Sequence, residues 1–102
     1  MARWVDVCRW EEVPEGRAVA VDVDGLAIAV YRHEDRPFAL LDRCPHAGGS
    51  MALGWVEDFE AICPLHRWRF RLASGRCTSG GGSLHRFKCE VGEDGQVRVE
   101  VG

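Results

Sequence analysis

Two short segments, each with one cysteine and one histidine, restrict most strongly how this chain can fold. Residues 44–46 read Cys-Pro-His and residues 63–66 read Cys-Pro-Leu-His, with sixteen residues between them. Proline fixes the backbone φ angle, so each segment is predicted to be a stiff loop. A fold that holds the two loops side by side presents two thiols and two imidazoles, which together form a metal-ligand set.

Two kinds of metal centre fit this ligand set. One is a structural zinc site with four Cys and His ligands. The other is a [2Fe–2S] cluster in which two cysteines hold one iron and two histidines hold the other. Zinc sites usually group the two cysteines together and the two histidines together, whereas each loop here mixes the two. The mixed order favours a two-iron cluster, and zinc stays open as the alternative.

The rest of the sequence is typical of β-structure. Asp24 and Gly25 predict a tight hairpin turn, and residues 96–101 alternate strictly between valine and polar side chains. No segment shows a sustained helical period with caps. We therefore predict an all-β antiparallel sandwich or barrel that forms one domain over residues 1–102, with a loop-rich insertion at about 43–82. The predicted strands cover residues 4–7, 19–23, 26–31, 38–41, 60–62, 68–71, 84–91 and 96–101.

Composition excludes several classes of protein. The formal net charge is −3, whereas a generic nucleic-acid-binding domain is basic. Apolar runs are far shorter than a membrane span, and the first residues lack the apolar run of a secretory signal, so we expect a cytoplasmic protein. Cysteines in that compartment serve metal binding more often than disulfides. Residues 61–89 contain six Arg or Lys and no acidic residue, which predicts that this segment can dock an acidic partner.

At residues 44–49 and 63–70 the sequence resembles the two cluster-binding loops of Rieske proteins. The order of strands, insertion and strands also matches that family across nearly the whole chain. The resemblance implies a β-sandwich base with a smaller cluster-binding subdomain. It also implies a [2Fe–2S] cofactor whose inner iron is held by Cys44 and Cys63 and whose outer iron is held by His46 and His66.

The resemblance further implies a soluble Rieske-type ferredoxin, which is an electron carrier and not an enzyme. Its partners would be a flavin-dependent reductase and a terminal oxygenase or similar acceptor, with no nucleic acid and no membrane. Two alternatives remain: the small Rieske-like subunit of an NAD(P)H nitrite reductase, whose second loop reads similarly, and a Cys₂His₂ zinc-stabilised interaction module.

Departures from the family's high-potential members indicate a low reduction potential. Leu65 occupies the place where respiratory Rieske proteins have an additional cysteine, and residues 67–70 offer no hydroxyl to bond the cluster sulfurs. Residues 79–83 fall about where many relatives have a proline-containing shielding loop, but here they read Ser-Gly-Gly-Gly-Ser.

Other chemically interesting side chains lack a ligand pattern. Cys8, Cys77 and Cys89 have no metal-ligand spacing and are predicted to be small core or surface thiols. His33 and His85 are predicted to face solvent.

Overall fold

The computed structural model describes residues 2–45 and 48–102. Over these residues the chain forms β-strands and two short 3-10 turns, at Trp10–Glu12 and Met51–Leu53, with no α-helix. The strands are β1 (Arg3–Arg9), β2 (Ala18–Val23), β3 (Leu26–His33), β4 (Arg36–Leu41), β5 (Trp55–Glu57), β6 (Glu60–Ile62), β7 (Arg69–Arg71), β8 (Arg86–Phe87), β9 (Cys89–Val91) and β10 (Gln96–Val101).

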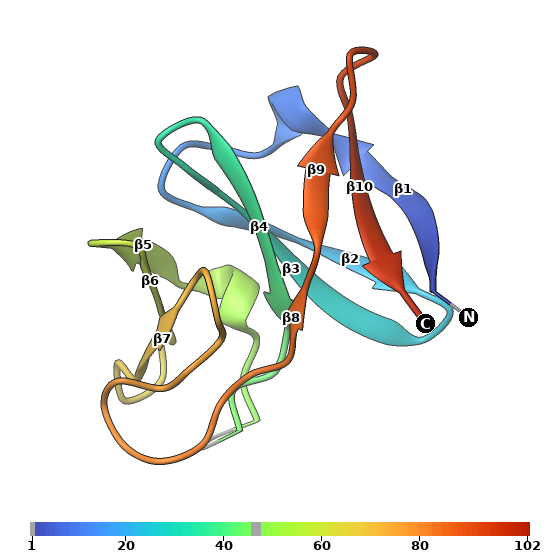
Figure 1. Ribbon diagram of the computed structural model, residues 1–102. Helices are drawn as coiled ribbons and strands as arrows, with labels where there is room; N and C mark the ends of the chain where they lie inside the picture. The colour runs from blue at the N-terminus through green and yellow to red at the C-terminus, as the bar shows by residue number, and fades with distance from the viewer. Residues whose placement is uncertain (1, 46–47) are drawn as a thin grey trace.

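The strands form three sheets, with the orders β1-β10-β9, β2-β3-β4-β8 and β5-β6-β7. Every pair of neighbouring strands is antiparallel, which confirms the predicted fold class. The first two sheets pack as the base, and the small third sheet lies to one side with the loops around it (Figure 1). The predicted turn is present, with Asp24 at φ 53° and Gly25 at φ 87°.

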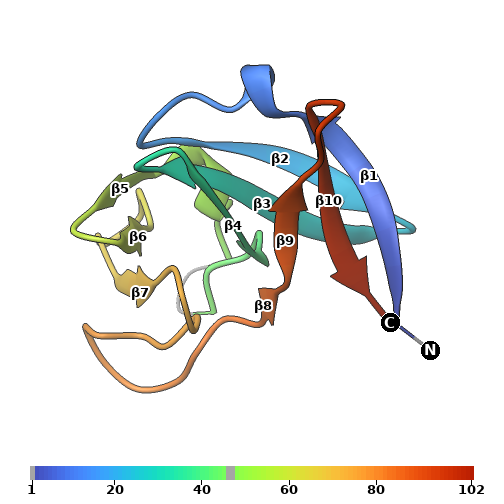
Figure 2. The same cartoon turned by 45° about the horizontal axis from the view of Figure 1, so that its top comes forward.

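The middle sheet is buried on both faces, and this explains the unbroken apolar run in β3. Ile28 and Val30 point into a core shared with β10, where Val97 and Val99 are fully buried. Ala29 and Tyr31, which share the opposite face of the strand, point into a second core against the loop-rich region. Because successive side chains of a strand alternate between faces, one strand joins the base to the site (Figure 2).

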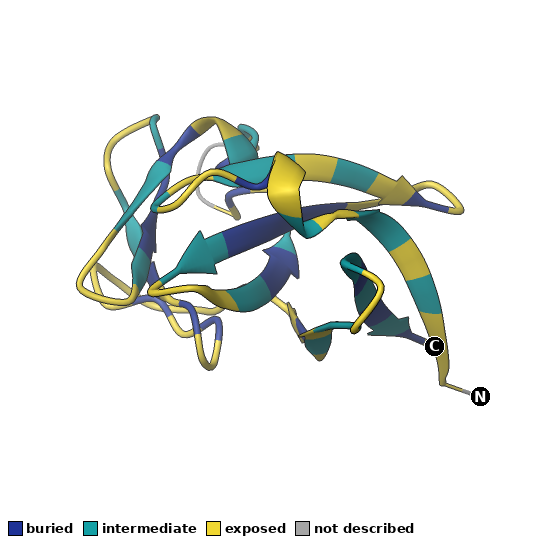
Figure 3. Cartoon of the chain, turned by 90° about the horizontal axis from the view of Figure 1, so that it is seen from above, coloured by how far each residue is buried: buried dark blue, intermediate teal, exposed yellow. Residues whose placement is uncertain are grey.

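Burial follows these layers. Buried residues gather on the inner strands and at the loops beside the third sheet, while turn tips are exposed (Figure 3). Within the described residues, no helix has the length and apolar character that a membrane crossing requires.

The structure differs from the predicted strands at three places. Strand β5 was not predicted. Strand β4 begins at Arg36, two residues before the predicted start at residue 38, because the preceding turn lies at Glu34 and Asp35, both with positive φ. The predicted strand 84–91 is split: β8 pairs with β4 and β9 pairs with β10. The chain therefore passes from one sheet to the other at Lys88.

Candidate metal centre

Cys44 and Cys63 approach each other from two different loops. Cys44 follows the end of β4, and Cys63 directly follows β6. Both side chains are fully buried, and the two thiols are joined by a hydrogen bond. Residues nineteen positions apart in the sequence are thus brought together, as the spacing of the two motifs predicts.

Backbone hydrogen bonds shape the first loop. The Cys44 N–H donates to the Gly49 carbonyl at 2.8 Å, and the Gly48 N–H donates back to the Cys44 carbonyl at 2.7 Å. Gly48 has a φ of 72°, which favours glycine. A Cβ on Gly49 would stand 2.6 Å from Cδ1 of Leu65. The glycine therefore lets the second loop pack directly on the first.

The second loop turns back on itself after the cysteine. The Cys63 N–H donates to the Trp68 carbonyl at 2.9 Å. His66 and Arg67 form the turn with φ angles of 63° and 56°, a left-handed conformation that side chains other than Asn and Asp rarely adopt. Both residues are exposed, so this turn lies at the surface of the site.

Burial controls the chemistry of the cysteine pair. Desolvation raises the pKa of the Cys63 thiol, a hydrogen bond from the Leu65 backbone N–H opposes that rise, and Cys44 raises the pKa further. Tyr31 lies beneath them with its hydroxyl donating to the Met51 carbonyl at 3.3 Å. Burial, with smaller effects from Asp42 and Cys63, raises the pKa of Tyr31 above its ordinary value.

The donor set of the two cysteines fits the thiolate half of a two-iron cluster. Thiolates are the ligands of such clusters, and a buried pair of negative charges is stable only when a cation neutralises it. The Leu65 N–H that points at the Cys63 sulfur would stabilise a thiolate there.

Three of the four predicted ligands, Cys44, Cys63 and His66, lie within the described residues. His66 stands on the same loop as Cys63, but the described residues contain no group of three or more metal-ligating side chains. His46 lies outside the described residues. The assignment of the two histidines as ligands therefore stays a prediction.

A carboxylate that the sequence reading missed closes the first loop. Asp42 Oδ1 accepts hydrogen bonds from the Ala52 N–H at 2.7 Å and from the Ser50 hydroxyl at 2.9 Å. The only sequence signal is that Asp42 stands two residues before Cys44.

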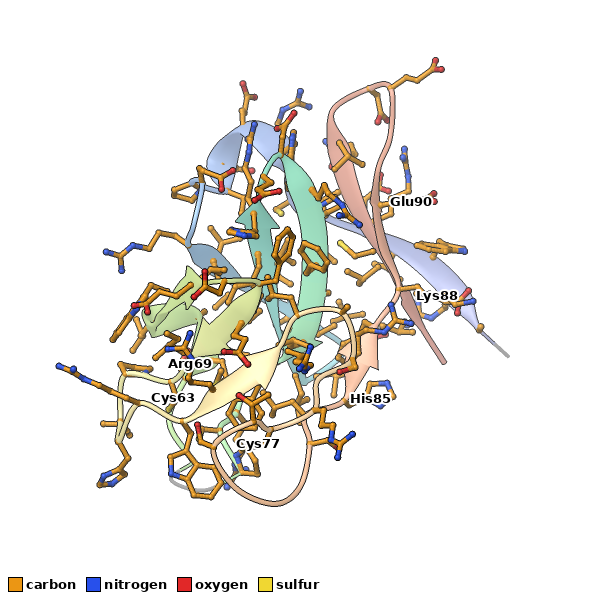
Figure 4. All side chains as sticks on the ribbon, turned by 60° about the vertical axis from the view of Figure 1, so that its left-hand side comes forward. Cys63, Arg69, Cys77, His85, Lys88 and Glu90 are labelled. Atoms are coloured by element: carbon orange, nitrogen blue, oxygen red, sulfur yellow. The ribbon has the colours of Figure 1, made fainter. Side chains whose placement is uncertain are left out.

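A second carboxylate, Glu60 on β6, was also missed. It accepts hydrogen bonds from Arg69 Nε and from the Thr78 hydroxyl, each at 2.7 Å. The Thr78 N–H also donates to the Arg69 carbonyl at 2.9 Å, and the Ser79 hydroxyl accepts from the Arg69 N–H at 2.9 Å. These contacts fasten the start of the glycine-rich segment to β7 (Figure 4 labels Arg69 and the neighbouring Cys77).

The glycine-rich segment, residues 79–83, reaches the site through Trp68. A Cβ on Gly80 would stand 3.1 Å from the Trp68 indole, and Trp68 packs against the core that contains both cysteines. The Cys77 N–H donates to the Gly82 carbonyl at 3.1 Å, so the segment folds as a narrow loop. The segment without proline thus contacts the core through glycine and indole.

The other thiols and imidazoles are placed mostly as predicted. All five cysteines are free thiols; Cys77 is buried, and Cys8 and Cys89 are partly buried. His85 is exposed, as predicted. The prediction for His33 was wrong: its side chain is 16 % exposed and packs edge-on against Phe59 with ring centroids 4.3 Å apart, because the extra strand β5 and its turn bring Phe59 over it.

Comparison with known proteins identifies a family. The family described as the Rieske [2Fe-2S] domain matches residues 3–97. The ferredoxin component of naphthalene 1,2-dioxygenase/salicylate 5-hydroxylase systems from Ralstonia sp. is 38 % identical over 77 residues, which cover 74 % of each chain.

Solved structures agree on the fold. The ferredoxin–oxygenase complex of carbazole 1,9a-dioxygenase gives a TM-score of 0.84 at 31 % identity, covering 94 % of this chain and 91 % of the other. A protein described as an NADH-dependent nitrite reductase small subunit from Mycobacterium tuberculosis gives a TM-score of 0.92 at 24 % identity, covering 100 % and 97 %. The second likeness is one of fold alone.

Proposed function

This chain belongs to the Rieske [2Fe-2S] domain family, and from that premise we propose that it delivers single electrons to the terminal oxygenase of a dioxygenase system. It is a ferredoxin-type electron carrier with a Rieske-type [2Fe–2S] cofactor. The family match therefore decides against the zinc site that the sequence left open. The observation that carries the proposal is the buried thiol pair of Cys44 and Cys63, held on two loops of a chain that is similar over most of its length to ferredoxin components.

We propose that Cys44 and Cys63 hold one iron and that His46 and His66 hold the other. The cluster, when bound, accepts and returns one electron. With two thiolate and two neutral imidazole ligands its oxidised form is electrically neutral, so reduction is easier than in an all-cysteine cluster. Two observations support this arrangement: both cysteines are fully buried, which suits an inner iron, and His66 is exposed, which suits an outer iron that faces a partner.

The rest of the site keeps water from the sulfurs. Leu65 covers Gly49, and Trp68 packs between the core and Gly80. A dry surrounding strengthens the electrostatic effect of every nearby charge and hydrogen bond on the cluster.

Charge supports an acidic partner. Of the six cations in residues 61–89, Arg69 forms ion pairs with Glu57 and Glu60. The other five are exposed, and no ion pair joins them to a carboxylate within the described residues: Arg67, Arg71, Arg76, Arg86 and Lys88. Exposed cations of one sign raise the encounter rate with an acidic surface. We propose that the oxygenase docks here, that a flavin-dependent reductase supplies the electron, and that the protein works in the cytoplasm.

An electron-transfer assay tests this function. The dithionite-reduced protein is mixed without oxygen with an excess of the oxidised oxygenase component of an aromatic-ring dioxygenase, and visible absorbance follows reoxidation. We expect reoxidation that slows as salt rises, because salt screens exposed charges. Arg71→Glu with Arg76→Glu should slow it further, while Arg17→Glu, an exposed cation before β2, should not. A cluster that stays reduced contradicts the proposal.

The nitrite reductase subunit is the second candidate, because the chain covers nearly the whole length of such a subunit with a TM-score of 0.92. A stable complex of the protein with a much larger siroheme-containing subunit would favour it. The proposed ferredoxin should instead purify without such a subunit.

A further inference from the structure

Asp42 fastens the two ends of the first cluster loop together. Its carboxylate accepts the Ser50 hydroxyl at 2.9 Å on Oδ1 and 3.0 Å on Oδ2, and the Ala52 N–H at 2.7 Å. Its own N–H donates to the Ala27 carbonyl of β3 at 3.0 Å. The loop that carries Cys44 is therefore tied at both ends to one side chain, which is anchored in turn to the middle sheet.

The charge of Asp42 is partly buried, and no ion pair to it is found in the described part of the chain. Its side chain is half-buried, and within the described residues no ion pair joins it to Arg or Lys. Among the described residues, its carboxylate accepts hydrogen bonds from two neutral donors, Ser50 and Ala52. The next carboxylates along the chain belong to Glu57 on β5, Asp58 in the turn after it and Glu60 on β6.

Asp42 stands two residues before Cys44. The two residues that it binds, Ser50 and Ala52, flank Met51, whose carbonyl accepts the Tyr31 hydroxyl at 3.3 Å. Its charge acts on Tyr31, and so does the charge of Cys63. Tyr31 is fully buried and belongs to the same core as Cys44 and Cys63. A negative charge at Asp42 is therefore felt in the interior that surrounds the two thiols, where screening by water is weak.

We propose that Asp42 is a positioning residue with two effects: its hydrogen bonds close the first cluster loop, and its partly buried negative charge lowers the reduction potential. The inference rests on the proposed cluster at Cys44 and Cys63. Reduction adds one negative charge to the cluster, so a fixed negative charge nearby disfavours the reduced form. This gives the low potential expected from the sequence a second, independent cause.

Two substitutions separate the charge from the hydrogen bonds. In Asp42→Asn the amide oxygen still accepts from Ser50 and Ala52, so the loop stays closed while the charge is lost. In Ser50→Ala the Asp42 carboxylate keeps its charge but loses the hydrogen bond from the Ser50 hydroxyl. Glu93→Gln is the matched control, because it removes one exposed carboxylate in the turn before β10, at the far end of the molecule.

The measurement is a redox titration of each purified holoprotein, followed by visible absorbance and by the EPR signal of the reduced cluster. We expect Asp42→Asn to raise the potential with an unchanged EPR spectrum, Glu93→Gln to leave it in place, and Ser50→Ala to leave it at or below the wild-type value. A potential for Asp42→Asn equal to that of Glu93→Gln overturns the inference. So does an upward shift in both loop variants, because that would be an effect of loop geometry.

If Asp42→Asn fails to retain iron, the potential of Ser50→Ala decides alone. A Ser50→Ala potential above the wild-type value contradicts an effect of the Asp42 charge. A potential at or below the wild-type value supports that effect. Failure of the proposed function is visible separately. Wild-type protein would then lack iron, sulfide and a dithionite-bleached absorbance before any variant is compared.

Discussion

Trp68 and Gly80 are in direct contact: a Cβ built on Gly80 would stand 3.1 Å from Cη2 of the indole. This contact lies between the glycine-rich segment and the core that holds both cysteines. We predict that Gly80→Ala pushes the indole or the segment aside and exposes the site to water, because packed interiors have little room to yield.

The matched control is Gly81→Ala, since a Cβ there meets nothing within 4 Å. The rate at which the 2Fe–2S absorbance bleaches in air should rise in Gly80→Ala and stay at the wild-type rate in Gly81→Ala. Equal rates in the two variants would mean that this contact does not shield the site.

The Thr78 hydroxyl donates a hydrogen bond to the Glu60 carboxylate, which also accepts one from Arg69. The glycine-rich segment is thereby held against the third sheet. Thr78→Val keeps the shape of the side chain but removes its hydroxyl, and a hydrogen bond to a carboxylate at a partly exposed position is worth about 1 kcal/mol. We expect faster bleaching in air and a slightly lower Tm, while Thr78→Ser restores both. A serine variant as impaired as the valine variant would assign the effect to packing.

Gly75 is required by its surroundings and by its backbone angle. Its φ is 79°, and a Cβ would stand 2.0 Å from the Leu84 carbonyl oxygen, which is backbone and cannot move aside. Gly75→Ala should destabilise the fold by about 3 kcal/mol or more.

Gly82 has a similar φ, 88°, but a Cβ there would meet nothing within 4 Å. Gly82→Ala should therefore lower the free energy of unfolding by only about 1 kcal/mol. Urea unfolding of both variants measures the difference. Equal losses would contradict the contact with Leu84.

Cys89 should be an unreactive thiol. Burial, with help from Cys8 and Glu90, raises the pKa of Cys89 to about 12. Only the thiolate reacts with alkylating agents, so at pH 8 its rate should be about three orders of magnitude below that of an ordinary thiol. The folded pKa is raised, so the rate should still climb about tenfold per pH unit between pH 8 and 10.

Iodoacetamide labelling followed by mass spectrometry of the peptide containing Cys89 checks this expectation, with the urea-unfolded chain as the reference. A labelling rate that levels off below pH 10 would show that the thiol is not held in this environment.

The strands could be predicted wherever local pattern and burial agree. Val97, Val99 and Val101 alternate in the sequence and are buried in the structure, and the Asp24–Gly25 turn formed as expected because its residues tolerate positive φ. Cys44 and Cys63 could be chosen as candidate ligands from the two motifs, and their role as a ligand pair stays a prediction.

Other features depend on tertiary contacts that no local pattern carries. The break at Lys88 arises because β8 and β9 pair with different sheets. Strand β5 is stabilised by pairing with β6 across a turn in which Phe59 has a φ of 62°, an angle that its residue type does not favour. The roles of Asp42 and Glu60 could not be predicted because their partners lie eight to eighteen residues away.

The most direct test of the central claim is pulsed EPR on the dithionite-reduced protein labelled with [¹⁵N]histidine. The chain has four histidines, and we expect nitrogen couplings from two of them, His46 and His66, which persist when His33 and His85 are replaced by glutamine. A reduced cluster with no histidine coupling, or with couplings lost in either glutamine variant, would contradict the account.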